Sequence, residues 1–81
     1  MIGSLSGRLT LKQAPAVMIE CGGVGYEVET PMSTFLDLPA VGETVSLHTH
    51  LQVRDTAHSL FGFSTQSEKA LFRALLSVSG V

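Results

Sequence analysis

Two adjacent glycines, Gly22 and Gly23, constrain the fold of this chain more than any other feature of its sequence. Apolar and polar residues alternate on both sides of them, which is the pattern of two strands that each bury one face. A two-residue Gly-Gly turn predicts a tight hairpin, because glycine tolerates the positive φ angles that such turns require. The resulting register places apolar pairs on one face: Cys21 with Val24, Ile19 with Tyr26, and Val17 with Val28.

A second hairpin is predicted over residues 44–63, with residues 54–58 as its turn. In the first strand, apolar residues alternate with polar ones, at Val45, Leu47, Leu51 and Val53. In the second strand, the same alternation continues at Ser59, Phe61 and Phe63. The expected register pairs Arg54 with His58, Leu51 with Phe61, and Thr49 with Phe63. This register gathers the bulky side chains on one face of the hairpin.

The first segment of the chain predicts a further strand, because Leu5, Leu9 and Leu11 face one way and polar residues face the other. Gly3 and Gly7 interrupt this strand, and glycines inside strands mark bulges or strong coiling. Residues 33–38 are expected to form one helical turn that carries Met32, Phe35 and Leu36 inward.

Five short strand-like runs therefore precede residue 65, and turn signals separate them. Strands this short and this closely spaced favour a mainly β fold, a small barrel or a sandwich, over a parallel α/β sheet.

From Thr65 the hydrophobic period becomes helical. Thr65 and Glu68 match a capping box, in which each side chain bonds a free backbone N–H at the start of a helix. A broad apolar stripe follows, and Gly80 fits the position after the last helical residue. The stripe consists of Leu71, Phe72, Leu75, Leu76 and Val78. Because so little chain remains to cover this stripe, we expect the sequence to be a fragment of a longer protein.

Composition narrows the possible functions. The net charge is −2, whereas a protein that binds nucleic acid tightly on its own usually has a basic surplus. The single cysteine, Cys21, excludes an internal disulfide framework and favours a reducing, cytoplasmic setting. No apolar run reaches the roughly 18 residues of a membrane helix, and no signal-peptide pattern opens the chain.

The side chains that could carry chemistry do not form a recognisable catalytic set. His48 and His50 share a strand face about 7 Å apart, but His58 is expected about 13 Å from His50, too far to share one metal ion. We therefore expect these histidines on a solvent-exposed face. Cys21 is expected to be a small buried residue rather than a nucleophile. No cofactor or metal is predicted, and nothing in the sequence favours an enzyme.

The turn of the second hairpin carries the most conspicuous charges, Arg54 and Asp55. A charged hairpin tip is ordinarily just a solvated turn. Alternatively, a protruding acidic tip acts by repulsion and keeps polyanion strands apart or steers them. The residues alone leave both interpretations open.

Taken together, the motifs resemble those of the bacterial RuvA family in their order and spacing across essentially the whole chain. The matching segments are residues 1–3, 22–28, 31–35, 49–50, 53–54, 62–63, 71–73 and 78–81. The resemblance implies an OB-fold five-stranded barrel over residues 1–64. It also implies that residues 65–81 begin a helix-hairpin-helix domain.

The resemblance further implies a non-enzymatic role in homologous recombination and DNA repair, within a homotetramer that binds four-way junction DNA. The implied protein partners are the RuvB ATPase and the RuvC resolvase, with no membrane and no cofactor. The family's acidic pin at the junction crossover falls on Asp55 and Thr56, beside Arg54, and Thr56 is neutral where the family has a second acid. The start of the first DNA-binding helix-hairpin-helix loop falls on Ser79, Gly80 and Val81.

Two other classes of function remain as alternatives. One is a general OB-type oligomerisation or protein-interaction module without a DNA role. The other is a metal-dependent enzyme on the face of His48 and His50, which would bind metal stoichiometrically.

Overall fold

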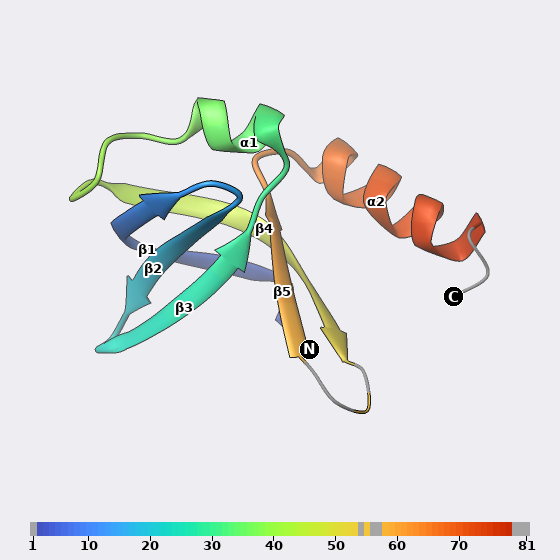
Figure 1. Ribbon diagram of the computed structural model, residues 1–81, viewed down its shortest axis with the longest axis horizontal. Helices are drawn as coiled ribbons and strands as arrows, with labels where there is room; N and C mark the ends of the chain where they lie inside the picture. Colours follow the sequence, from blue (N-terminus) through green and yellow to red (C-terminus); the bar gives the residue numbers. More distant parts are fainter. Residues whose placement is uncertain (1, 54, 56–57, 79–81) are drawn as a thin grey trace.

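The computed structural model describes residues 2–53, 55 and 58–78, and five strands close into a barrel beside which one longer helix projects (Figure 1). The order around the barrel is β1-β2-β3-β5-β4, with β1 also paired to β4. This is the arrangement of an OB fold, so the predicted fold class is confirmed. The elements are β1 Ser4–Gln13, β2 Ala16–Cys21, β3 Val24–Glu29, α1 Met32–Asp37, β4 Thr44–Val53, β5 His58–Phe63 and α2 Gln66–Val78.

The hairpin of β2 and β3 has the predicted register at every apolar pair, from Val17 opposite Val28 to Cys21 opposite Val24. Both turn glycines have positive φ, 56° at Gly22 and 87° at Gly23, as a tight turn that follows the strand twist requires. Val17, Ile19 and Val28 are buried and Tyr26 packs partly against the core, whereas Val24 beside the turn is half exposed. The barrel core therefore begins one pair inside the turn.

Strand β1 closes the barrel because it pairs with two neighbours along its length. Its first half, from Ser4 to Arg8, pairs with β4, and its second half, from Arg8 to Gln13, pairs with β2. The register with β2 shifts between Leu9 and Leu11. This irregularity corrects one expectation: Leu9 is fully buried, but Leu11 is 49% exposed on the outer surface.

The core inside the barrel draws on every strand and on the residue that follows α1. Each strand contributes its inward-facing aliphatic side chains, as alternation requires. The members are Leu5, Leu9, Val17, Ile19, Val28, Leu38, Leu47 and Leu60.

The register of β4 and β5 differs by one residue from the expected register. Leu51 lies opposite Leu60 and His50 opposite Phe61, while Val53 rather than Arg54 lies opposite His58. The expected register placed Phe61 opposite Leu51 and Phe63 opposite Thr49, with the bulky side chains on one shared face. Instead Leu60 faces the core and the two phenylalanines face outward, where α2 covers them. A second apolar layer outside the barrel is the physical reason for the shift.

Helix α1 was expected to direct Met32, Phe35 and Leu36 inward, and this was wrong for two of the three. Met32 is 60% exposed and Leu36 is 74% exposed, while Phe35 packs partly against the core. The helix instead buries Thr34, whose hydroxyl accepts a hydrogen bond from the Ser64 N–H at 3.1 Å. Among the described residues, no helix has the length and apolar character needed to span a bilayer.

We expect Gly7→Ala to lower the free energy of unfolding by about 1–3 kcal/mol, the usual cost of overpacking. A β-carbon at Gly7 would collide with the Glu20 carbonyl oxygen and lie 2.6 Å from Cys21 Sγ, so the pairing of β1 with β2 would have to shift. Gly3→Ala is the matched control, because its β-carbon meets nothing within 4 Å. Urea unfolding measures both, and equal stabilities of the two variants would contradict the role given to Gly7.

Candidate nucleic-acid interface

The strands β4 and β5 continue beyond the barrel as a two-stranded arm. The last residue of β4 that pairs with β1 is His48, so from His50 to Val53 the strand pairs with β5 alone. Strand β5 in turn pairs with β3 at one recorded position, Phe61 with Glu29. Side chains toward the end of this arm, including Val53 and His58, are exposed. In Figure 1 the arm runs downward, away from α1 and from the start of α2.

Asp55 lies in the bend at the end of this arm and is exposed, as expected for a charged tip. The other tip residues of interest, Arg54 and Thr56, lie outside the described residues. So do Ser79, Gly80 and Val81, the predicted start of a DNA-binding loop.

Helix α2 is seated on the outer face of the arm by one aromatic side chain. The ring of Phe72 lies 5.0 Å from Phe61, 5.1 Å from Phe63 and 5.5 Å from His50, measured between ring centroids. Aromatic pairs at these distances stabilise a contact beyond the area they bury. The helix therefore covers the side of β4 and β5 that faces away from the barrel core.

The start of α2 is fixed by Glu68, whose carboxylate accepts hydrogen bonds from four hydroxyls. Ser64 donates at 2.8 Å and Thr65 at 3.3 Å from the chain just before the helix, while Ser33 donates at 2.5 Å and Thr34 at 3.4 Å from α1. The hydroxyl bonds, with that of Ser33 foremost, hold the pKa of Glu68 below its ordinary value. Glu68 thus ties both helices to the end of β5.

The structure records one of the two hydrogen bonds of the predicted capping box. The backbone N–H of Glu68 donates to Thr65 Oγ1 at 3.2 Å, which is the N-cap bond. The Glu68 carboxylate accepts hydrogen bonds from the four hydroxyls. The local sequence pattern did not reveal this role, because two of the hydroxyls come from α1.

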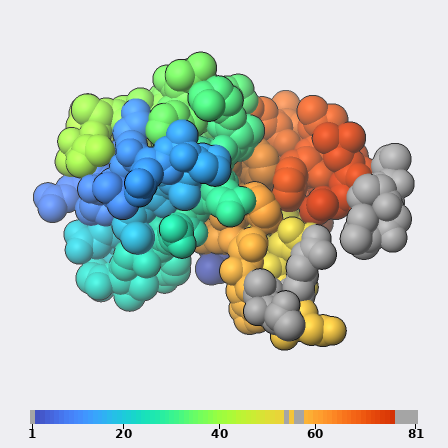
Figure 2. Space-filling view, in the orientation of Figure 1, coloured from blue at the N-terminus to red at the C-terminus, as the bar shows by residue number. Residues whose placement is uncertain are grey.

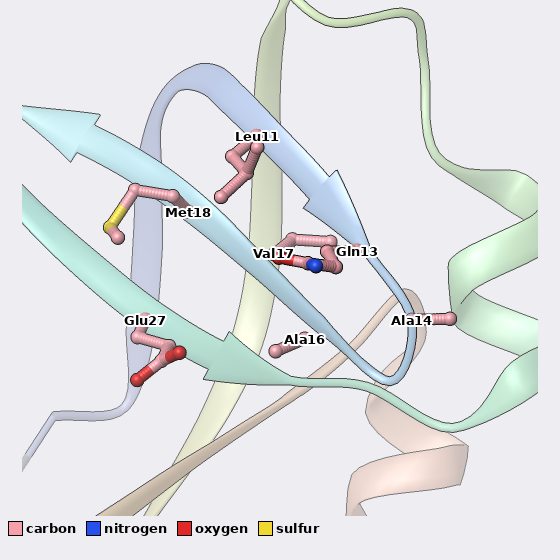
Figure 3. A pocket seen from close by; sticks show the side chains of 7 residues that line it. All are labelled: Leu11, Gln13, Ala14, Ala16, Val17, Met18 and Glu27. Atoms are coloured by element: carbon pink, nitrogen blue, oxygen red, sulfur yellow. The ribbon is translucent and has the colours of Figure 1, made fainter.

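Oligonucleotide-binding OB folds commonly use the outer face around their second and third strands. In this chain that face is acidic, because the outward positions of β2 and β3 include Glu20, Glu27 and Glu29. Figure 3 shows the hollow on this side of the barrel, where Leu11, Met18 and Glu27 project from three adjacent strands. A phosphate backbone would be repelled there, so this face is a poor nucleic-acid site.

Basic side chains gather instead around α2 and the outer face of β4. Lys69 and Arg73 lie one turn apart on α2. The positive charges of both contribute to lowering the pKa of His50. Burial, and then the charges of Arg73 and Lys69, hold the pKa of His50 below its ordinary value. In Figure 2 α2 forms the ridge at the right, adjoining the yellow and orange surface of β4 and β5.

The histidines were expected on a solvent-exposed face, and this was wrong for His50, which packs against Phe72. Its Nδ1 is buried and has no hydrogen-bond partner among the described residues. Sequence reasoning missed the basic surface itself. The four-residue spacing of Lys69 and Arg73 was a usable signal, but only the seating of α2 brings them over His50.

The remaining candidates for chemistry stay apart. Cys21 is only partly buried, packs against the core and donates its Sγ hydrogen to the Ser6 carbonyl at 2.8 Å. Within the described part of the chain, no group of three or more His, Cys, Asp or Glu side chains could hold a metal ion.

The apolar stripe predicted on α2 is buried on one side only. Phe72 and Leu76 are partly covered, whereas Leu71 is 61% exposed and Leu75 is 58% exposed. These two leucines line a groove of about 240 Å³ that also includes Pro31, Ser33, Phe63, Glu68 and Phe72. The groove is an apolar surface that this chain leaves open.

We expect this chain to self-associate weakly, because exposed apolar patches seek partners. The double change of Leu71→Ser and Leu75→Ser should abolish the rise of average mass with concentration in sedimentation velocity. Val41→Ser is the control, since Val41 is 54% exposed but lies in the loop before β4. A wild-type chain that stays monomeric at high concentration would contradict the expectation.

We expect His50 to titrate below 6.5, because its folded pKa is lowered from that value. The unfolded chain then takes up a proton at higher pH than the folded chain, so the stability that His50 contributes is lost as pH falls below 6.5. Histidine NMR titration gives the midpoint directly. Urea unfolding at pH 7.5 and 5.5 should show that the free energy of unfolding falls less in His50→Gln than in wild type. An NMR titration midpoint of His50 above 6.5 would contradict this expectation.

Comparison with known proteins adds independent information. The model of the RuvA N-terminal domain family matches residues 1–62. The chain is 57% identical over its full 81 residues to the Holliday junction branch migration complex subunit RuvA of Thioalkalivibrio sulfidiphilus, and 54% identical to that of Methylococcus capsulatus. It spans 40% of the length of each of these relatives.

Proposed function

This chain belongs to the RuvA N-terminal domain family, and on that premise we propose that it is the N-terminal barrel of a subunit that binds Holliday junctions during branch migration. The relatives named above are subunits of a Holliday junction branch migration complex. Identity of 57% and 54% over the full 81 residues supports a shared role.

The observation that carries the proposal is the position of Asp55. The residue stands exposed at the end of a two-stranded arm that projects from the barrel. In the proposed role Asp55 is the acidic pin, placed where the strands of the junction cross, and it repels their phosphates. Thr56 next to it supplies no second charge, so the repulsion comes from one carboxylate, with Arg54 beside it.

The proposed barrel contributes architecture rather than the main grip on DNA. Its acidic β2–β3 face supports this division, since that face disfavours phosphate. The loop that begins at Ser79, Gly80 and Val81 would bind duplex backbone through its N–H groups, in a helical domain that starts at residue 65. The subunit would act as a homotetramer with the RuvB ATPase and the RuvC resolvase, and would have no catalytic activity of its own.

A second candidate is an OB-type oligomerisation module without a DNA role. The open apolar groove at Leu71 and Leu75 favours this candidate, because such a surface suits a protein partner. DNA binding separates the two: only the junction-binding role predicts an effect of the Asp55 charge on affinity.

We expect Asp55→Asn in the full-length protein to tighten binding to four-way junctions by up to about fivefold, since a unit charge 4 Å from another in water contributes about 1 kcal/mol. Thr56→Asp should weaken binding by a similar factor. Both effects should shrink as salt rises, because screening shortens the reach of the charges. A salt series that compares junction with linear duplex measures them.

The matched control for this series is Asp37→Asn, which makes the same chemical change on exposed α1. Asp55→Asn should alter the free energy of unfolding by no more than about 0.5 kcal/mol, as is usual for exposed sites. If neither tip variant changes affinity, junction preference or branch-migration rate at low salt, the tip is an ordinary solvated turn.

A further inference from the structure

A positively charged surface on α2 and β4 does not include the acidic tip. Its positive charges are those of Lys69 and Arg73, and His50 and His48 lie beside them on one face of β4. The two cations of α2 are two of only five Lys and Arg residues in the whole chain. Their position next to the arm therefore concentrates a large share of the positive charge in one place.

Among the described residues, no carboxylate is recorded as acting on His50 beside these cations. The two ionised groups that act on His50 are both cations, Arg73 and Lys69. The nearest carboxylate on α2, that of Glu68, is bonded to the Ser33 and Ser64 hydroxyls on the side of α1. Like charges four residues apart also destabilise a helix slightly. An anion bound between them would relieve this repulsion.

The side chains are also free to reach a ligand. Arg73 is exposed, and Lys69 uses its ammonium group for one described hydrogen bond, to the Gly3 carbonyl oxygen at 3.2 Å. An ammonium group has three N–H donors, so two remain available. His50 beside them does not reach outward: its Nδ1 is buried and has no partner among the described residues, and its ring packs against Phe72, so it supports the two cations from below.

We propose that Lys69 and Arg73, with His50 beneath them, form a contact for the sugar–phosphate backbone of DNA, separate from the acidic tip. This inference rests on the proposed junction-binding function. It adds an attraction between these cations and DNA phosphates to the repulsion by Asp55. The end of β4 at Val53 lies three residues beyond His50, roughly 10 Å along the strand, and Asp55 follows that end in the sequence. That separation already reaches the screening length of about 8–10 Å at physiological salt, so the tip opposes the attraction only weakly.

The test is a salt series on the full-length protein with the double variant Lys69→Gln and Arg73→Gln. Each phosphate contact to duplex DNA contributes about 0.9 to the slope of log affinity against log salt, so losing two contacts should flatten the slope by up to about 1.8. Affinity should fall on junction and on linear duplex alike, because backbone contacts carry no base information.

The matched control is the double variant Arg8→Gln and Lys12→Gln, which removes the same charge from β1 and should leave the slope nearer to wild type. Lys69→Arg with Arg73→Lys keeps both charges and should restore the wild-type slope, which separates charge from helix packing. Circular dichroism and thermal unfolding show whether each variant is folded. If the Gln double variant destabilises the helix, the variant with Lys69→Arg and Arg73→Lys still tests the inference. If that variant is folded but has lost its DNA binding, the inference is overturned.

The outcomes separate this inference from the proposed function. If wild type binds junctions and the Asp55 variant behaves as expected, but the Lys69 and Arg73 double variant keeps the wild-type slope, the inference is overturned and the function stands. If wild type shows no junction preference and the double variant still flattens the slope on duplex, the phosphate contact stands and the function falls. If wild type binds neither DNA, both fall.

Discussion

The structure depends on the double pairing of β1, whose two halves bond to different neighbours and so close the sheet on itself. The change of partner occurs at Arg8, which pairs with both Glu20 and Thr44, next to Gly7. Only a residue without a side chain fits at Gly7, because β2 passes too close for a β-carbon. Closure removes free sheet edges and fixes where β4 leaves β1. The arm that carries Asp55 starts at that point.

The second constraint is that the outer face of β4 and β5 is also apolar. Phe61 and Phe63 would be exposed on a bare barrel, so their burial by Phe72 favours the docking of α2. Glu68 then fixes the start of the helix through hydroxyls from α1 and from the end of β5. The helix and the arm are consequently held by one set of contacts. Charges on α2 keep a defined position relative to the charge at the tip.

The sequence predicted those parts of the fold that depend on local rules. The hairpin at Gly22 was correct in register because strict alternation and turn chemistry agree. The register of β4 with β5 was not, since alternation cannot show which of two apolar faces lies inside the barrel. The inward side of α1 was missed because it is set by Ser64 and Glu68, about thirty residues away. The exposure of Asp55 was predicted from the sequence and its role stays a prediction, whereas the surface of Lys69 and Arg73 depends on the docking of α2.

The composition predicts that this chain binds DNA only weakly on its own, and the distribution of charge refines that prediction. The net charge of −2 is a sum over the whole chain, and it hides an acidic β2–β3 face and a basic surface on α2. Exposed charges in salt act over about 8–10 Å, so a phosphate responds to the side chains near it rather than to the sum. In the proposed role, two cations give a weak, salt-dependent attachment to DNA, and one carboxylate gives a weak repulsion. Under that proposal, the two together would orient a DNA backbone without holding it tightly.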